Sequence, residues 1–276
     1  MNTSEGSFKL YNGLKVDPVG YGTYLARPGS VSEAVKAGYR YFDTASFYKN
    51  EEMVGEELRS CGIPREDVFI ASKIWPTEFG YEEGKEAFER SLKRLQTDYL
   101  DLYLLHWPLV KGDPEWKEHL ISTWKAVSEL YREGRIRAVG VSNFLPHHLQ
   151  VLYDSSDIKP MVDQLELHVG YMQQYTVDHC RENGIHVQAW SPLGRGRLRE
   201  NGIVLKMASD YGVTPGKFLL RFLNQQGISI IPKTDDPGRM RSNLDIGGFT
   251  ISDHDMSYLM SMPQTAFSGE HPDIDL

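Results

Sequence analysis

Four side chains able to hold or transfer a proton stand close behind short apolar runs of the chain. Asp43 ends the run YFD, Lys73 ends VFIASK, and His106 ends YLDLYLLH, while Tyr48 follows Asp43 by five residues. A charged group at the end of a buried strand is costly unless it is paired or hydrated. If the three runs are parallel strands of a barrel, their carboxyl ends meet at one mouth, and the four groups share a pocket.

Together these groups can protonate the oxygen of a carbonyl compound. A free tyrosine, with a pKa of about 10, is a weak acid near neutrality, and a cationic neighbour lowers that pKa. Lys73 can be this neighbour, with Asp43 orienting its ammonium group, so that Tyr48 protonates a developing alkoxide. A neutral His106 can donate a hydrogen bond to the same oxygen.

Each of the four residues also has a purely structural interpretation. Asp43 and Lys73 can form a buried ion pair that only supports the fold, because such pairs also occur at strand ends. His106 can bond a backbone carbonyl in the core, and Tyr48 can pack in a loop. It is the joint occurrence of the four that favours chemistry.

The elements that must position these groups are visible as an alternation of short apolar runs and amphipathic stretches. Beyond the three runs above, the alternation continues through RAVGVSN, MVDQLELH, HVQAW and ISIIPK, and an opening strand near Pro18–Gly22 completes eight strand–helix units. In one helical stretch, Trp124, Val127 and Leu130 share an apolar face. Nearly continuous apolar strands joined by helices indicate a parallel sheet that is covered on its faces.

We therefore predict an α/β fold, a (β/α)8 TIM barrel with an N-terminal β-hairpin, forming a single domain over residues 1–276. A doubly wound open sheet is the alternative. The hairpin is predicted from FKLYNGLKV, in which Asn12-Gly13 suits a type I′ turn. GYGTYL begins like a dinucleotide-binding G-x-G fingerprint, but it ends in Leu25 and no helix pattern follows, so we reject a Rossmann site.

Composition limits which binding partners and which cellular compartment we expect for the protein. The 276 residues carry a formal net charge of −8 and no Lys/Arg-rich block, so we do not expect nucleic-acid binding. No apolar run is long enough for a membrane span, and MNTSEGSFKL does not resemble a secretory signal. Cys61 and Cys180 lie far apart with no CxxC, which predicts reduced thiols in a cytoplasmic protein, expected to be a monomer or weak oligomer. The adjacent His147-His148 lacks the H-x-H spacing of metal-dependent hydrolases, so no metal is predicted.

In their order, the motifs resemble those of the aldo-keto reductase family. Between about residues 18 and 245 the matching stretches are VGYGTY, GYRYFDTASFYKNEE, ASKIWPT, YLDLYLLHWP, VGVSNF, VDQLELH, AWSPLG, IPKT and RMRSN. The chain is similar to the small bacterial-type members, such as diketogluconate and methylglyoxal reductases. The resemblance implies a (β/α)8 barrel that reduces aldehydes and ketones to alcohols by hydride transfer from NADPH, since no side chain supplies hydride.

The resemblance also implies roles for the four groups. Asp43, Tyr48, Lys73 and His106 occupy the positions of the family's catalytic tetrad, with Tyr48 as general acid and His106 holding the substrate carbonyl. An alternative, known among other members of the superfamily, is a non-catalytic NADP(H)-binding protein with a regulatory or interaction role. A complete tetrad favours the enzyme.

The nucleotide is expected across the barrel mouth. Carried over from the family, the cofactor-binding residues are Thr23, Tyr24, Ser142, Asn143, Gln164, Trp190, Ser191, Leu193, Lys233, Thr234, Arg239 and Asn243. Trp190 would stack on the nicotinamide, and Asn143 and Gln164 would bond its carboxamide. Taken alone, Asn143 could cap a helix starting near Leu145. Gln164 could bond Glu166 or a water, and Trp190 could be a core residue.

At the adenine end, PKTDDPGRMRSN brings together Lys233 and Arg239, which suit the 2′-phosphate of NADPH. Asp235 and Asp236 stand where relatives usually carry neutral residues, and their negative charge would oppose a phosphate. Alternatively, Asp236 followed by Pro237 is the N-cap of a helix, and for Asp236 we favour this interpretation. We therefore predict NADPH as the cofactor, with NADH as a weaker possibility.

An aromatic group near the tetrad completes the predicted site. By the resemblance, the substrate-binding residues are Tyr24, Phe47, Trp75 and Trp107. An apolar aromatic wall suits a small carbonyl substrate and keeps water from the reacting atoms. The final stretch AFSGEHPDIDL has no bulky cradle for a steroid, which again favours a small substrate.

Overall fold

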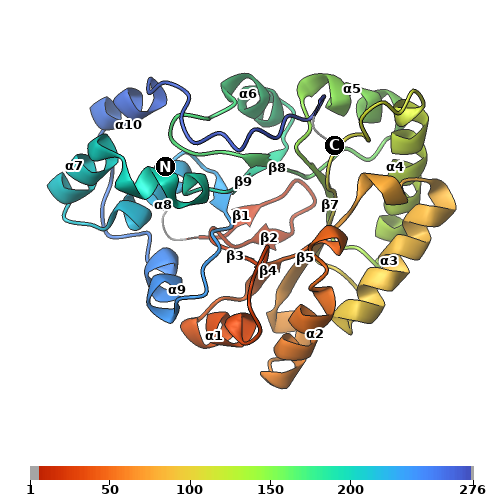
Figure 1. The fold of residues 1–276 in the computed structure, drawn as a ribbon. Helices are drawn as coiled ribbons and strands as arrows, with labels where there is room; N and C mark the ends of the chain where they lie inside the picture. The colour runs from red at the N-terminus through yellow and green to blue at the C-terminus, as the bar shows by residue number, and fades with distance from the viewer. Residues whose placement is uncertain (1–5, 275–276) are drawn as a thin grey trace.

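A closed ring of eight parallel strands forms the centre of the computed structural model, which describes residues 6–274 (Figure 1). The strands pair in sequence order: β3 (Tyr21–Gly22), β4 (Tyr41–Asp43), β5 (Phe69–Ile74), β6 (Leu102–Leu105), β7 (Val139–Ser142), β8 (Val162–Glu166), β9 (His186–Trp190) and β10 (Ser229–Ile230). A parallel bridge between Val19 and Ile230 joins the last strand to the first. The predicted (β/α)8 barrel is confirmed, and the open-sheet alternative is wrong.

Helices surround the ring on its outside (Figure 1). Within the described residues they are α1 (Ser30–Ala37), α2 (Glu51–Ser60), α3 (Tyr81–Leu95), α4 (Trp116–Arg132), α5 (Pro146–Ser155), α6 (Gln174–Glu182), α7 (Gly202–Asp210), α8 (Pro215–Asn224), α9 (Pro237–Leu244) and α10 (Asp253–Met260). Short 3-10 helices are η1 (Ser46–Tyr48), η2 (Arg65–Asp67), η3 (Pro76–Glu78) and η4 (Gly194–Glu200).

Local sequence signals account for the faces and ends of these helices. In α4, Trp124, Val127 and Leu130 are buried, as their spacing predicts. Helix α9 begins at Pro237 because the Asp236 carboxylate accepts the Arg239 N–H at 2.7 Å. Asp236 is therefore a helix cap, as the alternative interpretation of this residue held.

The N-terminal hairpin consists of β1 (Phe8–Lys9) and β2 (Lys15–Val16), which pair antiparallel. Its turn differs from the predicted type I′: the Gly13 N–H bonds the Leu10 carbonyl at 2.9 Å, and of the Asn12-Gly13 pair only Gly13 has a positive φ, 89°. A longer turn closed by a left-handed glycine gives the same reversal. Asn12 Nδ2 donates to the Arg137 carbonyl ahead of β7, so the hairpin covers the end where the strands begin.

No helix formed by residues 6–274 is long and apolar enough to cross a membrane.

The contact between α2 and α3 gives a test of the helix layer. A Cβ at Gly55 would lie 2.6 Å from the Leu95 carbonyl, so we expect Gly55→Ala to lower the free energy of unfolding by about 1–3 kcal/mol. Urea denaturation measures the change. Gly216→Ala in α8, where no atom lies within 4 Å, is the control and should be neutral or slightly stabilising. Equal effects of the two variants would contradict this packing.

Candidate active site

An ion pair between Asp43 and Lys73 lies buried at the carboxyl end of β4 and β5. Lys73 Nζ is 2.6 Å from Asp43 Oδ1 and also donates to the Thr44 carbonyl at 2.9 Å. The two side chains are 2% and 0% exposed, so water cannot hydrate either charge. A pair this deep persists only when hydrogen bonds satisfy both ions.

Tyr48 and His106 complete a compact group around this pair. Tyr48 follows β4 in η1, and its hydroxyl lies 3.4 Å from Lys73 Nζ. The His106 ring, directly after β6, stands 5.5 Å from the Tyr48 ring at an angle of 76°. Its Nδ1 is buried and has no hydrogen-bond partner among residues 6–274, so the imidazole retains unused bonding capacity. The four residues singled out by sequence thus meet at one mouth.

Burial keeps both Tyr48 and His106 uncharged at neutral pH. Although the Tyr48 ring is partly exposed, burial of its hydroxyl raises the pKa well above its usual value, with added effects from Asp43, Tyr24 and Glu270. Burial and then Lys73 lower the pKa of His106 well below its usual value. The expectation that Lys73 lowers the Tyr48 pKa is not met in this structure, because burial and the nearby Asp43 carboxylate raise that pKa.

Aromatic side chains form one wall of the mouth. Phe47 stacks on Trp75 with ring centroids 3.9 Å apart, and Trp75 meets His106 edge-on at 5.1 Å. Tyr24 lies 5.0 Å from Tyr48, and both Tyr24 and Phe47 are about half exposed. Trp107, in contrast, is only 5% exposed, so most of its indole packs in the core.

A second side of the mouth is formed by Asn143, directly after β7, and Trp190, the last residue of β9. Asn143 Nδ2 donates to the His106 carbonyl at 3.1 Å, and its Oδ1 accepts the Trp190 indole N–H at 2.7 Å. Asn143 does not cap α5: the N-cap residue is Leu145, whose backbone N–H donates to His148 Nδ1 at 3.1 Å. Trp190 is partly exposed beside this amide, so one part of its indole remains open at the mouth.

Gln164 connects this side of the mouth to the ion pair. Its Nε2 donates to Asp43 Oδ2 at 2.8 Å and to Gln188 Oε1 at 2.7 Å. Glu166, the alternative partner considered for Gln164, instead accepts the Ser268 hydroxyl at 2.6 Å. Gln188 was missed from sequence, where its only signal is a polar residue inside the strand HVQAW.

The remaining cofactor candidates near the tetrad are engaged in the fold. The Thr23 hydroxyl donates to the Asp43 carbonyl at 2.9 Å, and the Ser142 hydroxyl donates to the Gln164 carbonyl at 2.7 Å. Ser191, directly after β9, has a positive φ of 48°, which turns the chain sharply at the mouth. These residues shape the backbone beside the site.

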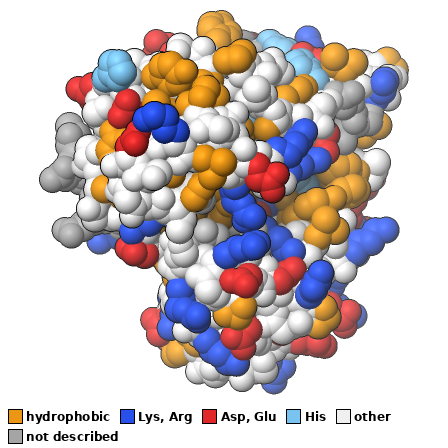
Figure 2. All heavy atoms as spheres, turned by 60° about the vertical axis from the view of Figure 1, so that its left-hand side comes forward, with side chains coloured by type: hydrophobic (Ala, Val, Ile, Leu, Met, Phe, Trp, Pro, Cys, Tyr) orange, Lys and Arg blue, Asp and Glu red, His pale blue; other side chains and the backbone are white. Residues whose placement is uncertain are grey.

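A second cavity, of about 500 Å³, lies where the adenine end was predicted. Of the predicted residues it is lined by Leu193, Lys233, Thr234, Arg239 and Asn243; Arg199 and Thr214, which sequence reasoning missed, also line it. Figure 2 turns the side of α7–α9 toward the viewer and shows Lys and Arg side chains along an indented part of this face. The Lys233 ammonium is already paired with Asp235 at 2.7 Å, and the Ser30 hydroxyl holds the same carboxylate at 2.8 Å.

The C-terminal stretch crosses the mouth of the barrel, which no sequence signal indicated. Besides the bond from Ser268 to Glu166, Glu270 pairs with Arg195 at 2.9 Å. The Arg195 guanidinium in turn lies 5.8 Å from the centroid of a Trp190 ring. The ion pair of Arg195 and Glu270 therefore lies beside Trp190 at the mouth.

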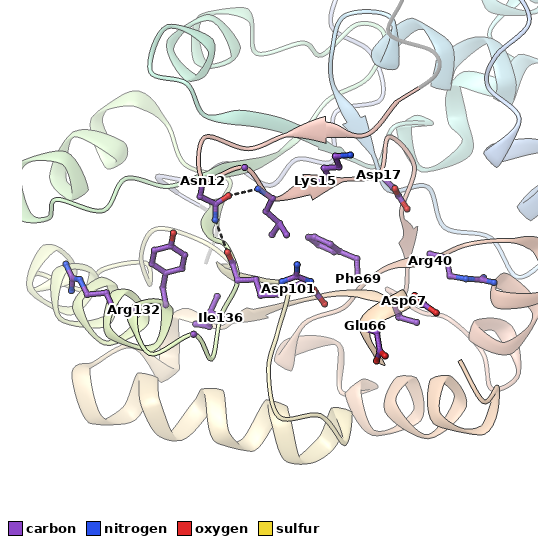
Figure 3. A pocket seen from close by; sticks show the side chains of 16 residues that line it. Asn12, Lys15, Asp17, Arg40, Glu66, Asp67, Phe69, Asp101, Arg132 and Ile136 are labelled. Carbon is purple, nitrogen blue, oxygen red and sulfur yellow. Dashed lines mark hydrogen bonds and ion pairs between the residues drawn. The ribbon is translucent and has the colours of Figure 1, made fainter. Parts of the chain in front are cut away.

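Another cavity, of about 910 Å³, lies at the opposite end of the barrel, between the hairpin and the strand beginnings (Figure 3). Asp101, in its lining, is already bonded to Arg65 and Arg137 at 2.8 Å each. Reactive groups of such barrels gather at the carboxyl ends of the strands, so size alone does not make this cavity the site.

One cluster of possible metal ligands exists among the described residues: His147, His148 and Asp273. His148 Nδ1 accepts the Leu145 N–H at 3.1 Å, so in the neutral ring the proton sits on Nε2. That nitrogen faces Asp273 at 2.9 Å and must be bare to bind a metal. The cluster instead ties the C-terminal stretch to α5.

Comparison with known proteins gives concordant results over nearly the whole chain. A family model described as "Aldo/keto reductase family" matches residues 29–263. Glyoxal reductase of Bacillus subtilis (strain 168) is 42% identical over 270 residues, covering 96% of this chain and 95% of that protein. Methylglyoxal reductase DkgA of Escherichia coli O157:H7 is 35% identical and covers 96% of each chain.

A solved structure shares the architecture as well. MGS-M4, an aldo-keto reductase enzyme from a Medee basin deep-sea metagenome library, superposes with a TM-score of 0.90 at 37% identity. The match covers 97% of this chain and 98% of that one.

The Asp43–Lys73 pair predicts a large effect on stability. Lys73→Met leaves the Asp43 carboxylate buried without its cation, so we expect the free energy of unfolding to fall by about 3–5 kcal/mol. Adding Asp43→Asn to that variant should restore part of the loss. Urea denaturation of both variants is the measurement.

Lys217→Met provides the matched control. Lys217 pairs with Asp245, which is 76% exposed, so its loss should cost less than about 1 kcal/mol. Similar losses for Lys73→Met and Lys217→Met would contradict the buried character of the first pair.

Proposed function

Because the chain belongs to the aldo/keto reductase family, we propose that it reduces small aldehydes and ketones to alcohols with NADPH. The observation that carries the proposal is the group of Tyr48, His106, Lys73 and Asp43 at one barrel mouth. It unites a protonated phenol, a neutral imidazole and a paired lysine within hydrogen-bond or van der Waals reach. The reductase names of the relatives do not favour the alternative of a non-catalytic nucleotide-binding protein.

In this mechanism the side chains handle the proton and the orientation of the substrate. NADPH, when bound, supplies the hydride that adds to the carbonyl carbon. Tyr48 gives its proton to the carbonyl oxygen, so that hydride plus proton yields the alcohol. His106 donates a hydrogen bond to that oxygen and fixes its direction. Lys73, held by Asp43, stabilises the phenolate left on Tyr48.

The residues present fit a nicotinamide nucleotide. Trp190 offers a flat apolar face beside Asn143, and Gln164 Oε1 accepts no hydrogen bond from the described part of the chain, so both can serve the nicotinamide end. Lys233 and Arg239 line the second cavity, where they would hold a 2′-phosphate. Asp235 weakens this preference because it already neutralises Lys233, which leaves NADH as a second, weaker cofactor.

We propose small, neutral dicarbonyl compounds as the substrate class. The stacked Phe47 and Trp75 give an apolar surface next to His106, which suits a short carbonyl compound. The names of the two relatives described above, a glyoxal and a methylglyoxal reductase, support the same class. Trp107 contributes through its exposed edge only.

The working state proposed for the protein is a cytoplasmic monomer or weak oligomer that binds no nucleic acid. In the described structure Cys61 and Cys180 are both free thiols, in keeping with a reducing compartment. The net charge of −8 disfavours a polyanionic partner.

Tyr48→Phe tests the acid. The variant loses the proton donor and little volume, so turnover of NADPH with methylglyoxal should fall by at least about 100-fold. The Kd for NADPH, measured by fluorescence titration, should stay within about twofold. Wild-type turnover in Tyr48→Phe would refute the assignment, whereas loss of nucleotide binding would show that Tyr48 shapes the pocket instead.

Asp235→Asn tests the cofactor preference. Removing the carboxylate frees Lys233 for a 2′-phosphate, so we expect the ratio of affinities for 2′,5′-ADP over 5′-AMP to rise about five- to tenfold. Calorimetric titration measures both ligands. Asp157→Asn, which frees Arg132 at the other end of the barrel, is the control and should leave the ratio unchanged. An unchanged ratio in Asp235→Asn would contradict the role of this carboxylate.

A further inference from the structure

A row of polar side chains runs through the barrel interior beneath the tetrad. Gln164, Gln188 and Ser229 are register partners on the neighbouring strands β8, β9 and β10. All three are at most 1% exposed. Interiors of such barrels are usually filled with branched apolar residues, and burying an amide is costly unless it is bonded. We therefore expect these three polar side chains to have a role other than packing.

The hydrogen bonds in the row have a definite direction. Gln188 Oε1 accepts from the Tyr41 hydroxyl at 3.0 Å and from Gln164 Nε2 at 2.7 Å. Gln188 Nε2 donates to the Ser229 hydroxyl at 3.1 Å, and Gln164 Nε2 also donates to Asp43 Oδ2 at 2.8 Å. Both N–H donors of the Gln164 side chain are thereby used inside the barrel.

The orientation of the Gln164 amide depends on these two acceptors together. An amide group can turn over with little change in shape, because its oxygen and nitrogen are nearly the same size. Turned over, Gln164 would press its oxygen against Asp43 Oδ2 and Gln188 Oε1. Asp43 Oδ2 would then lose its donor, and Gln188 Oε1 would keep only the Tyr41 hydroxyl. A buried acceptor without a donor costs about 1–3 kcal/mol, and this cost at Asp43, together with the repulsion between the Gln164 and Gln188 oxygens, holds the amide in its orientation.

We propose that Gln188 is a positioning residue for the reaction: it locks the Gln164 amide with nitrogen toward Asp43 and oxygen toward the barrel mouth. Two consequences follow at the site. The second oxygen of Asp43 keeps a donor while the first holds Lys73. The Gln164 oxygen remains as the acceptor for the amide hydrogens of the nicotinamide carboxamide, a step that rests on the proposed function.

Gln188→Met is the decisive variant. Methionine keeps the unbranched shape and removes both polar atoms, so Gln164 loses the second acceptor that fixes its orientation. We expect the Kd for NADP⁺ to rise about tenfold while the Kd for 2′,5′-ADP, which has no nicotinamide, stays unchanged. A merely structural role would not separate these two ligands. Isothermal calorimetry gives both constants without turnover.

Two further variants serve as rescue and control. Gln188→Glu keeps an acceptor oxygen for Tyr41 and Gln164 and should restore the affinity for NADP⁺ to within about threefold of the wild type. Tyr41→Phe removes a donor to the same Gln188 oxygen without freeing Gln164, so it should leave both Kd values unchanged. If Gln188→Met does not fold, Gln188→Asn, which draws the acceptor back by one bond, provides the same comparison.

The outcomes separate the inference from the proposed function. Equal Kd values for NADP⁺ in the wild type and Gln188→Met, or equal losses for NADP⁺ and 2′,5′-ADP, would overturn the positioning role while the reductase stands. A wild-type protein that binds neither NADPH nor NADP⁺ would overturn the proposed function, and the inference with it.

Discussion

The arrangement of the site depends on one interaction, the buried ion pair between Asp43 and Lys73. Removing an ammonium and a carboxylate from water costs several kcal/mol each, and mutual attraction offsets that cost only in good geometry with every remaining donor and acceptor satisfied. The barrel provides this geometry by fixing β4 beside β5, so that Lys73 Nζ reaches both Asp43 and the Thr44 carbonyl. Gln164 supplies the remaining donor to Asp43 from β8. The pair therefore requires several strands to hold their places at once.

The same lack of water that makes the pair costly sets the charge states of its neighbours. Burial disfavours the charged form of every group, so it raises the pKa of Tyr48 and lowers that of His106. Both side chains are consequently neutral hydrogen-bond donors near pH 7, pointing from two elements toward one mouth. A single physical cause thus gives the two groups complementary abilities: one can release a proton, and the other can orient an oxygen without taking a charge.

The fold and the chemical centre could be read from sequence because their signals are local. Asp43, Lys73 and His106 each end an apolar run, and parallel strands bring such ends together, so adjacency along the strands predicted adjacency in space. Gln188 shows where this reasoning stops. The position of Gln188 in HVQAW does not predict which buried polar atoms its side chain will bond. Those partners depend on the register of the strands around the barrel. Even the turn at Asn12-Gly13 was predicted in place but not in type, since one hydrogen bond from Gly13 to Leu10 decides between the two forms.

The rim of the site was the least predictable part, and its energetics explain why. Glu270 pairs with Arg195, which is distant in sequence, and Asp235 pairs with Lys233 at the second cavity. All four side chains are at least partly exposed. Exposed pairs contribute about 0–1 kcal/mol each, so folding does not require any one of them, and a sequence carries little record of which pair will form. The buried centre has no such freedom, because a missing partner there leaves a charge without compensation. The preference for cofactor and substrate can therefore change at the rim, one exposed charge at a time, while the ion pair and the polar row beneath it hold the reacting groups in place.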